Sequence, residues 1–289
     1  MKENKKPVIA IVGETGSGKT NLAIQLAKKY NGELISADSR AIYKYLDIGT
    51  AKPTEEELDG VKIWGIDLIK PDEKYSVYDY QKYAKNKIAE IHSRDKIAIL
   101  VGGSGLYVDS VILNYQFSGV KDVSISLNLD KMSIGELTNY CIKNNIILPE
   151  NNKNKRFLIN SILRTNQPSK QHNPSDNFLV LGIHIPIDKL AIRLIRRAKD
   201  MIKFGIKKEA IQVFEKYGHN NESMKGNIYS LLTNQSIEDK ILIQKCLESD
   251  LKLAKKQRTW FKRNNFIKWI DYDNPLEQAE IEIEKKFCS

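Results

Sequence analysis

A glycine-rich octapeptide near the N-terminus carries residues whose types and spacing suit phosphate binding. Residues 13–20 read GETGSGKT, which fits the pattern G-x-x-x-x-G-K-[ST]. Glycines let backbone N–H groups converge on phosphate oxygens, and the N-terminus of a following helix adds a partial positive charge. We expect Lys19 to reach the terminal phosphate oxygens and Thr20 to hold Mg²⁺. The expected phosphate-binding residues are Gly13, Thr15, Gly16, Ser17, Gly18, Lys19 and Thr20.

A carboxylate and a hydroxyl follow two other apolar runs. Asp38 ends the run that begins at Glu33, and Ser104 follows the run from Lys96 to Val101 across two glycines. Phosphoryl-transfer enzymes with such a loop need a second carboxylate for Mg²⁺, but a carboxylate near the phosphates can also act as a base. The residues alone leave both roles open for Asp38, and they leave open which polyphosphate the loop binds.

These side chains must be positioned by alternating strands and helices. Short apolar runs predict buried strands, and apolar residues three and four apart predict helices. Such an alternation indicates an α/β fold with a mostly parallel sheet flanked by helices, as in P-loop NTPases. Ligands then gather at the carboxyl ends of the strands, where the glycine loop, Asp38 and Ser104 would share one edge. The expected elements are strands at 7–12, 33–38 and 96–101, a third apolar stretch at 61–69, and helices at 21–30, 77–92 and 106–113.

The middle of the chain differs from what precedes and follows it. Residues 115–175 are rich in Asn, Ser and Lys and have weaker periodicity, which predicts a small, mainly helical insertion domain. The core would then comprise residues 1–114 and 176–289. Within the insertion and after it we expect short helices at 133–145 and 155–163, a strand at 178–185, long helices at 187–217 and 237–264, a last strand at 266–270 and a terminal helix at 276–287.

Composition limits the class of protein. The chain has 289 residues, 41% of them hydrophobic, and no apolar run approaches the roughly 20 residues of a membrane span. Its three cysteines lie far apart, which predicts a reducing cytoplasm and neither disulfides nor a zinc site. The formal net charge of +10 exceeds what a small anion requires and suits an anionic polymer such as RNA. Lysine-rich drift in the coding sequence is the alternative explanation.

Several longer segments carry a specific resemblance. Residues 35–44 read ISADSRAIYK and continue to DIGTAKP at 47–53; GGSGLY stands at 102–107, YSVYDY at 75–80 and AKKQRTWFK at 254–262. Together with the glycine loop, these segments resemble the tRNA dimethylallyltransferase family, whose motifs read GPTxSGKT, ISADSRQIYxxMDIGTAKP, YSVADF, VGGTGLY and AKRQxTWFR. The resemblance is nearly continuous to residue 113 and resumes at 193–205 and 254–262.

The resemblance implies a reaction. The family transfers a dimethylallyl group from dimethylallyl diphosphate to N6 of the adenosine on the 3′ side of the anticodon, so the glycine loop would bind a diphosphate leaving group. Asp38 matches the family's general base, and Ser104 stands where the family has a threonine hydroxyl. Arg197 matches an arginine of R-x-x-x-R-x-x-x-M-x-x-x-G, seen here from Arg193 to Gly205, and would clamp the diphosphate. A solvated helix face is the alternative for Arg197.

The acceptor implied by the resemblance is the anticodon stem-loop of tRNA, bound by a monomer. The cations and aromatics around residue 258 suit phosphates and splayed bases, although the same run could be the end of an amphipathic helix with Trp260 and Phe261 buried. The expected tRNA contacts are Ser39, Arg40, Tyr43, Lys255, Lys256, Gln257, Arg258 and Trp260, with the insertion at 115–175 also facing tRNA.

Some positions depart from the family pattern. Glu14 replaces a proline, which is unfavourable beside a diphosphate unless the carboxylate points away. Ala41 replaces a glutamine, the word GIGYKE is reduced to GNIYS at 226–230, and only Lys153–Arg156 remains of an arginine-rich helix. The donor site is therefore better preserved than the acceptor site.

Three rival functions use the same residues. An adenylate isopentenyltransferase shares the donor chemistry, but the basic charge and the Trp260 region favour RNA over a free nucleotide. A non-catalytic RNA-binding protein would not need Lys19, Thr20, Asp38 and Ser104. A P-loop kinase leaves the other matched segments unexplained.

Overall fold

A computed structural model describes residues 6–117, 129–149, 151–163, 173–225, 227–233 and 236–287. The chain divides into two compact units, one formed by residues 1–113 with 173–289 and the other by residues 114–172. No helix in the described ranges is long and apolar enough to cross a membrane.

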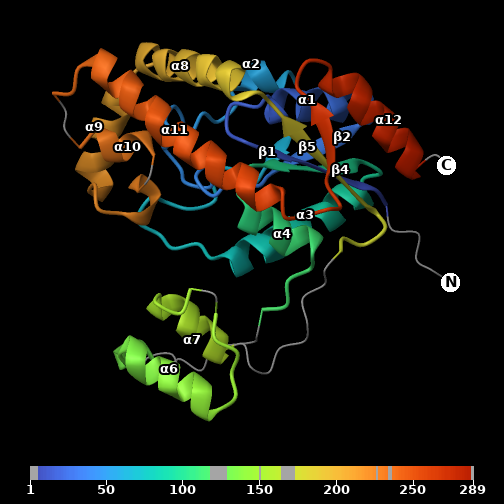
Figure 1. The fold of residues 1–289 in the computed structure, drawn as a ribbon. Helices are drawn as coiled ribbons and strands as arrows, with labels where there is room; N and C mark the ends of the chain where they lie inside the picture. The colour runs from blue at the N-terminus through green and yellow to red at the C-terminus, as the bar shows by residue number, and fades with distance from the viewer. Residues whose placement is uncertain are drawn as a thin grey trace. The chain divides into compact units, whose positions relative to one another are not determined.

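The larger unit is built on a six-stranded sheet whose order is β3-β2-β4-β1-β5-β6, with every neighbouring pair parallel (Figure 1). β1 and β4 are apolar along almost their whole length because both faces of a parallel sheet are covered. The strands are β1 Val8–Gly13, β2 Gly32–Ser36, β3 Ile63–Trp64, β4 Ile97–Gly102, β5 Phe178–His184 and β6 Lys268–Asp271.

The register of the strands determines where the loops after β1, β2 and β4 leave the sheet. Val12 of β1 pairs with Gly102 of β4, and Ser36 of β2 pairs with Val101. Beyond the last pairs, the Ala37 N–H donates to the Val101 carbonyl at 2.7 Å and the Ser104 N–H donates to the Ala37 carbonyl at 3.2 Å. The three loops that follow β1, β2 and β4 therefore leave the sheet side by side at its carboxyl edge.

Helices cover both faces of the sheet (Figure 1). On one face, buried residues of α1 and α12, among them Leu22, Leu26 and Ile283, pack with Ile9 and Ile99 of the strands. On the other face lie α3 and α4, where the Tyr80 ring stacks on Tyr107 with centroids 4.0 Å apart and the Tyr80 hydroxyl donates to the Ser36 carbonyl. These helices are α1 Lys19–Lys29, α3 Val77–Ser93, α4 Gly105–Ile112 and α12 Pro275–Phe287.

The remaining helices of the larger unit are α2 Glu55–Leu58, α8 Ile187–Lys203, α9 Ile206–Tyr217, the 3₁₀ helix η1 Glu222–Met224, α10 Ile228–Leu231 and α11 Asp239–Phe261. Residues of α8, α10 and α11 line a cavity at the carboxyl edge of the sheet, whereas Leu58 of α2 packs against the core beside α1. The single helix predicted over 187–217 is wrong: the chain breaks at Gly205, whose φ of 92° lies in the left-handed region that glycine adopts without strain. The predicted stretch 61–69 forms only the two-residue strand β3.

The smaller unit has a core of its own. Its helices α6 Ile134–Lys143 and α7 Lys155–Leu163 lie within the two segments predicted to be helical. Ser133 is the N-cap of α6 and forms a capping box with Glu136. The core of the smaller unit consists of Leu129, Leu137, Cys141, Ile146, Leu158, Ile159 and Ile162.

Candidate functional site

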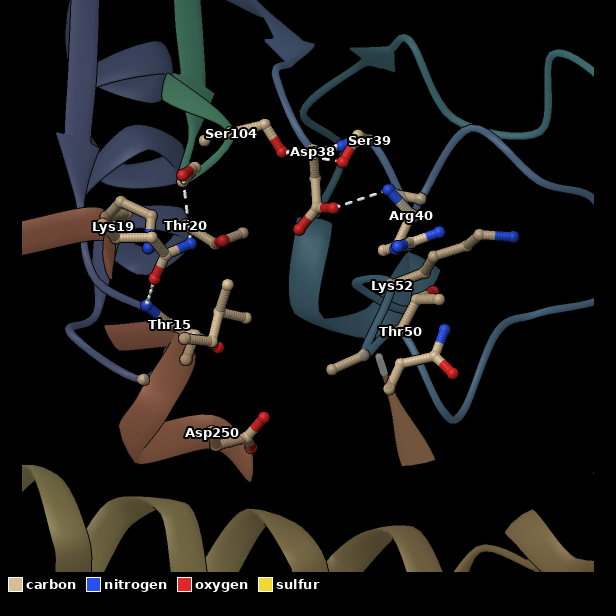
Figure 2. Close-up of a pocket in the computed structure, with 18 of the residues that line it drawn as sticks. Thr15, Lys19, Thr20, Asp38, Ser39, Arg40, Thr50, Lys52, Ser104 and Asp250 are labelled. Carbon is tan, nitrogen blue, oxygen red and sulfur yellow. Dashed lines mark hydrogen bonds between the residues drawn. The ribbon is translucent and has the colours of Figure 1, made fainter. Parts of the chain in front are cut away.

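A cavity of about 810 Å³ opens where the loops after β1, β2 and β4 meet α8 and α11 (Figure 2). Its size is within the range of ordinary small-molecule sites. The predicted site residues that line it are Thr15, Gly16, Gly18, Lys19, Thr20, Asp38, Ser39, Arg40, Ser104, Arg197, Lys256, Gln257 and Trp260. The predicted residues that do not line it are Gly13, Ser17, Tyr43, Lys255 and Arg258.

The glycine loop has the backbone that an anion cradle needs. Gly13, Gly16 and Gly18 all have positive φ, at 147°, 78° and 96°. Gly18 is the N-cap of α1 and supplies no side-chain cap, so the first N–H groups of the helix remain available to an anion. Ser17 differs from expectation: its N–H donates to the Glu14 carbonyl, and its buried hydroxyl has no hydrogen-bond partner among the described residues.

Lys19 and Thr20 lie at the start of α1 and face the cavity. The Lys19 side chain is only partly exposed, and its ammonium group donates to the Glu14 carbonyl. Burial of that ammonium group lowers the pKa of Lys19 to about 8, with the nearby Arg197 lowering it further and Asp38 opposing the shift. An anion beside Lys19 would therefore stabilise the charged form and oppose this shift.

Asp38 and Ser104 lie together beyond the ends of β2 and β4 (Figure 2). One carboxylate oxygen of Asp38 accepts the Arg40 N–H at 2.8 Å, which holds the side chain in a turn. The Ser104 hydroxyl accepts the Ser39 N–H at 2.9 Å and donates to the Ser39 hydroxyl at 3.1 Å. In the described structure the second oxygen of Asp38 has no hydrogen bond and is open to a ligand in the cavity.

Arg197 faces the cavity from α8. Its guanidinium donates to the Thr15 hydroxyl and lies 4.0 Å from the Asp250 carboxylate of α11, while its buried Nε has no hydrogen-bond partner among the described residues. A buried guanidinium N–H without a partner is costly, and an anion in the cavity could satisfy it. Arg193, one turn earlier, donates to the Ser17 carbonyl at 3.1 Å. The alternative of a solvated helix face therefore does not describe Arg197.

Two side chains near the end of α11 contact the glycine loop. The Gln257 side-chain oxygen accepts the Thr15 N–H at 2.8 Å, and its amide donates to the Gly103 carbonyl at 3.0 Å. Arg258 forms a two-pronged pair with Glu14, and the Trp260 Nε1–H donates to Asp109 at 2.8 Å. Gln257 and Arg258 thus join α11 to the loops, and Trp260 joins it to α4, while the tRNA contacts expected of these three residues stay predictions. Lys255 and Lys256 are exposed.

Glu14 has an explanation that the sequence did not provide. It is only 2% exposed, does not line the cavity, and receives two hydrogen bonds from Arg258, 244 residues away. The Arg258 guanidinium also donates to the Ile185 carbonyl at 2.9 Å. The carboxylate therefore points away from the phosphate site and is neutralised.

Two further predicted tRNA contacts have their side chains engaged within the protein. Tyr43 is only 5% exposed and its backbone bridges Ile69, so little of its side chain is available for the predicted tRNA contact. Arg40 donates to the Glu222 carbonyl at 2.6 Å but still lines the cavity.

Sequence reasoning missed several lining residues. Lys52 is nearly buried and donates to the Tyr43 carbonyl, Asp47 and Asp67. Asp250 lies one helical heptad before Gln257 and so shares its face of α11, which is a signal that could have been used. Burial raises the pKa of Asp250, and Arg197 opposes that shift.

The residues present fit Mg²⁺ only as an ion that arrives with phosphate. Thr20 lines the cavity and offers a hydroxyl oxygen. In the described ranges no group of three or more His, Cys, Asp or Glu side chains could hold a metal. Since Mg²⁺ is commonly bound by few protein groups together with water and phosphate oxygens, this donor set is compatible with it.

Comparisons with known proteins identify relatives along the whole chain. A family model described as IPP transferase matches residues 41–264. A protein named tRNA dimethylallyltransferase from Staphylococcus aureus is 34% identical over 298 residues, covering 95% of each chain. The structure of a tRNA isopentenylpyrophosphate transferase from Staphylococcus epidermidis is 30% identical, with a TM-score of 0.71 over 97% of this chain and 99% of that one.

A more distant structure shares the fold. A eukaryotic dimethylallyltransferase acting on tRNA is 23% identical, with a TM-score of 0.82 over 98% of this chain and 80% of that one.

Proposed function

The chain belongs to the tRNA dimethylallyltransferase family and prenylates tRNA, and we propose that its donor is dimethylallyl diphosphate and its acceptor N6 of the adenosine 3′ to the anticodon. The observation that carries this proposal is one cavity lined by Lys19, Asp38, Ser104 and Arg197. A cation pair beside a carboxylate suits a reaction in which an anionic group leaves while a proton is removed.

Departure of diphosphate is the first requirement. As the allylic C–O bond breaks, its electron pair goes to diphosphate, and the charge that develops there is stabilised by preorganised donors. Those donors are the first N–H groups of α1, the Lys19 ammonium and the Arg197 guanidinium. Mg²⁺, held by Thr20 and the phosphate oxygens, would supply further charge neutralisation when bound.

Attack by the acceptor needs a base. The N6 amine of adenine is a poor nucleophile because its lone pair is delocalised into the ring. The free oxygen of Asp38 accepts an N6 proton as the N6–carbon bond forms, which leaves a neutral secondary amine. The Ser104 hydroxyl stays oriented by the Ser39 N–H and can turn its one hydrogen from the Ser39 hydroxyl to the oxygen that bridges phosphorus and carbon.

The experiment is incubation with dimethylallyl diphosphate, Mg²⁺ and either unmodified tRNA or AMP, followed by mass spectrometry of adenosine. We expect N6-prenylated adenosine on tRNA. Product on AMP alone would make the protein an adenylate isopentenyltransferase, and no product on either would make it a non-catalytic RNA-binding protein.

Asp38→Asn should remove turnover while diphosphate binding, measured by calorimetry, stays largely intact. Equal loss of diphosphate binding would instead indicate a metal-ligand role. A cytoplasmic location and a monomeric state stay predictions.

A further inference from the structure

Two tyrosines form a small surface pocket beside the loop that follows Asp38. The ring of Tyr45 stacks on that of Tyr217 at the end of α9, with centroids 6.0 Å apart and planes inclined by 20°. The Lys216 ammonium lies 4.9 Å from the Tyr45 ring centre and 5.3 Å from that of Tyr217. The pocket, of about 130 Å³, is also lined by Glu209, Gln212 and Val213.

The Tyr45 ring is presented to solvent by a constrained backbone. The residue is 48% exposed and has a φ of 66°, in the left-handed region that bulky side chains rarely adopt. Such conformations persist where the surroundings hold them and cluster at ligand-binding sites. Here Lys44 on one side donates its N–H to the Ile69 carbonyl, and Asp47 and Ile48 on the other side donate theirs to Glu209.

The loop that carries Tyr45 also forms the wall of the reaction cavity. Arg40 lines that cavity before Tyr45, and Gly49 lines it afterwards. Tyr45 lies five positions after Arg40, so at most about 18 Å of extended chain lies between them. A short stretch of unstacked RNA whose adenosine enters the cavity can therefore reach the tyrosine ring.

The aromatic ring and the ammonium group of this pocket suit a nucleotide. An exposed aromatic ring offers a flat face to any nucleobase, and an adjacent ammonium group offers a counter-charge to the phosphate that follows it. The formal net charge of +10 acts in the same direction. An apolar peptide would use the ring but not the charge.

We propose that Tyr45, supported by Tyr217 and Lys216, is a stacking site for an unpaired base of the tRNA anticodon loop other than the adenosine that is modified. This inference rests on the proposed function. It adds a binding site outside the reaction cavity and involves no covalent step.

The first test compares affinities for a fluorescent, unmodified anticodon stem-loop RNA at fixed salt. Tyr45→Leu keeps an apolar side chain that is not branched at Cβ but removes the ring. We expect it to weaken binding by about 5- to 100-fold, the range for loss of one stacked base. Tyr45→Phe should bind within about twofold of the unchanged protein, and Lys216→Ala should weaken binding less than Tyr45→Leu does. The KM for dimethylallyl diphosphate at saturating RNA should not change.

The second test locates the base. Each unpaired loop nucleotide is replaced in turn by an abasic one, and affinities are compared between the unchanged protein and Tyr45→Leu. One abasic position should weaken binding to the unchanged protein and add no further loss in Tyr45→Leu, because the two changes remove the same contact. Unchanged affinity in Tyr45→Leu, or losses that add fully at every position, would overturn the stacking site. Prenylation of the stem-loop by the unchanged protein is followed in parallel, so that failure of the proposed function appears separately as missing product.

Discussion

Glu14 shows how one residue can be tolerated beside a phosphate site. A carboxylate in a glycine loop would oppose diphosphate binding if its charge faced the ligand. Here both of its oxygens accept hydrogen bonds from Arg258, and the side chain is almost completely buried. Arg258 follows Gln257, which bonds the N–H of Thr15 in the same loop. At the residue scale, α11 therefore fixes both the charge and the shape of the anion cradle.

Removal of Arg258 should expose this dependence. Arg258→Met leaves a buried carboxylate without a partner, and we expect a loss of about 3 kcal/mol in the free energy of unfolding and a higher KM for dimethylallyl diphosphate. The measurements are urea unfolding followed by circular dichroism and steady-state kinetics. The double variant Glu14→Met with Arg258→Met should recover much of the stability, because apolar side chains often replace a buried ion pair without penalty. A double variant less stable than Arg258→Met would contradict this explanation.

The pKa of Lys19 predicts opposite pH dependences for donor binding and stability. Its folded-state pKa of about 8 lies below the ordinary value of 10.5. As pH rises through about 8 the free protein loses the ammonium charge, so kcat/KM for the donor should fall. Between about pH 8 and 10.5 the unfolded chain binds more protons at this group than the folded protein, so its contribution to the free energy of unfolding should rise.

Kinetics and unfolding measured from pH 6.5 to 10 test both signs. The matched control is Lys19→Arg, which remains charged throughout this range. Its donor kcat/KM, although lower at pH 7, should lack the fall near pH 8. The same fall in both proteins would mean that another group titrates.

At the element scale, α9 holds the loop that forms one wall of the cavity. The Glu209 carboxylate accepts the N–H groups of Asp47, Ile48 and Gly49 at 2.9–3.1 Å and the hydroxyl of Tyr229. Burial and the Glu209 charge raise the pKa of Tyr229 well above its ordinary range, which keeps it a donor. Gly49 is required here because a Cβ would lie 2.5 Å from the Tyr229 ring.

Glu209→Ala should release this loop. It removes the acceptor of the Asp47 and Ile48 N–H groups and leaves the Gly49 N–H with the Tyr229 hydroxyl alone, and we expect a loss of about 2 kcal/mol in the free energy of unfolding. Hydrogen exchange should become faster at the amides of residues 47–49 than the loss of global stability explains. At the amides of β1, exchange should change only as much as the global stability does. Glu209→Gln, which keeps one acceptor oxygen, should lie between the two proteins. Unchanged exchange at residues 47–49 in Glu209→Ala would show that other contacts hold the loop.

Features set by residues close together in the chain could be predicted from the sequence, whereas features set by distant residues could not. The sequence predicted that the glycine loop, Asp38 and Ser104 lie at one edge of the sheet. Each follows a strand, and the carboxyl ends of parallel strands lie at the same edge. The break at Gly205 had a local signal, a glycine within a helical pattern, that was not used. The pairing of Glu14 with Arg258 and the burial of Tyr43 depend on contacts far apart in the chain, which periodicity does not encode. The resemblance stated from the motifs is confirmed by relatives that cover 95% of the chain or more.

For the whole molecule, the formal net charge of +10 makes a prediction that no single residue makes. Binding of RNA releases condensed counterions, so affinity falls with salt in proportion to the number of phosphates neutralised. We expect anticodon stem-loop affinity to fall at least about tenfold between about 50 and about 200 mM KCl, which corresponds to two or more phosphate contacts. The measurement is fluorescence anisotropy over a salt series, plotted as log affinity against log salt concentration.

The slope of that plot also distinguishes contacts between cations and phosphates from stacking of a base on an aromatic ring. Lys256 is an exposed cation that lines the cavity, so Lys256→Ala should reduce the slope by about one phosphate contact. Trp260 is uncharged and bonded to Asp109, so it contributes no counterion release of its own. Tyr45→Leu should lower affinity at every salt concentration and leave the slope unchanged, because stacking releases no counterions. A reduced slope in Tyr45→Leu would mean that the tyrosine acts by holding Lys216 near a phosphate, whereas a flat plot for the unchanged protein would show that its positive charge does not serve RNA binding.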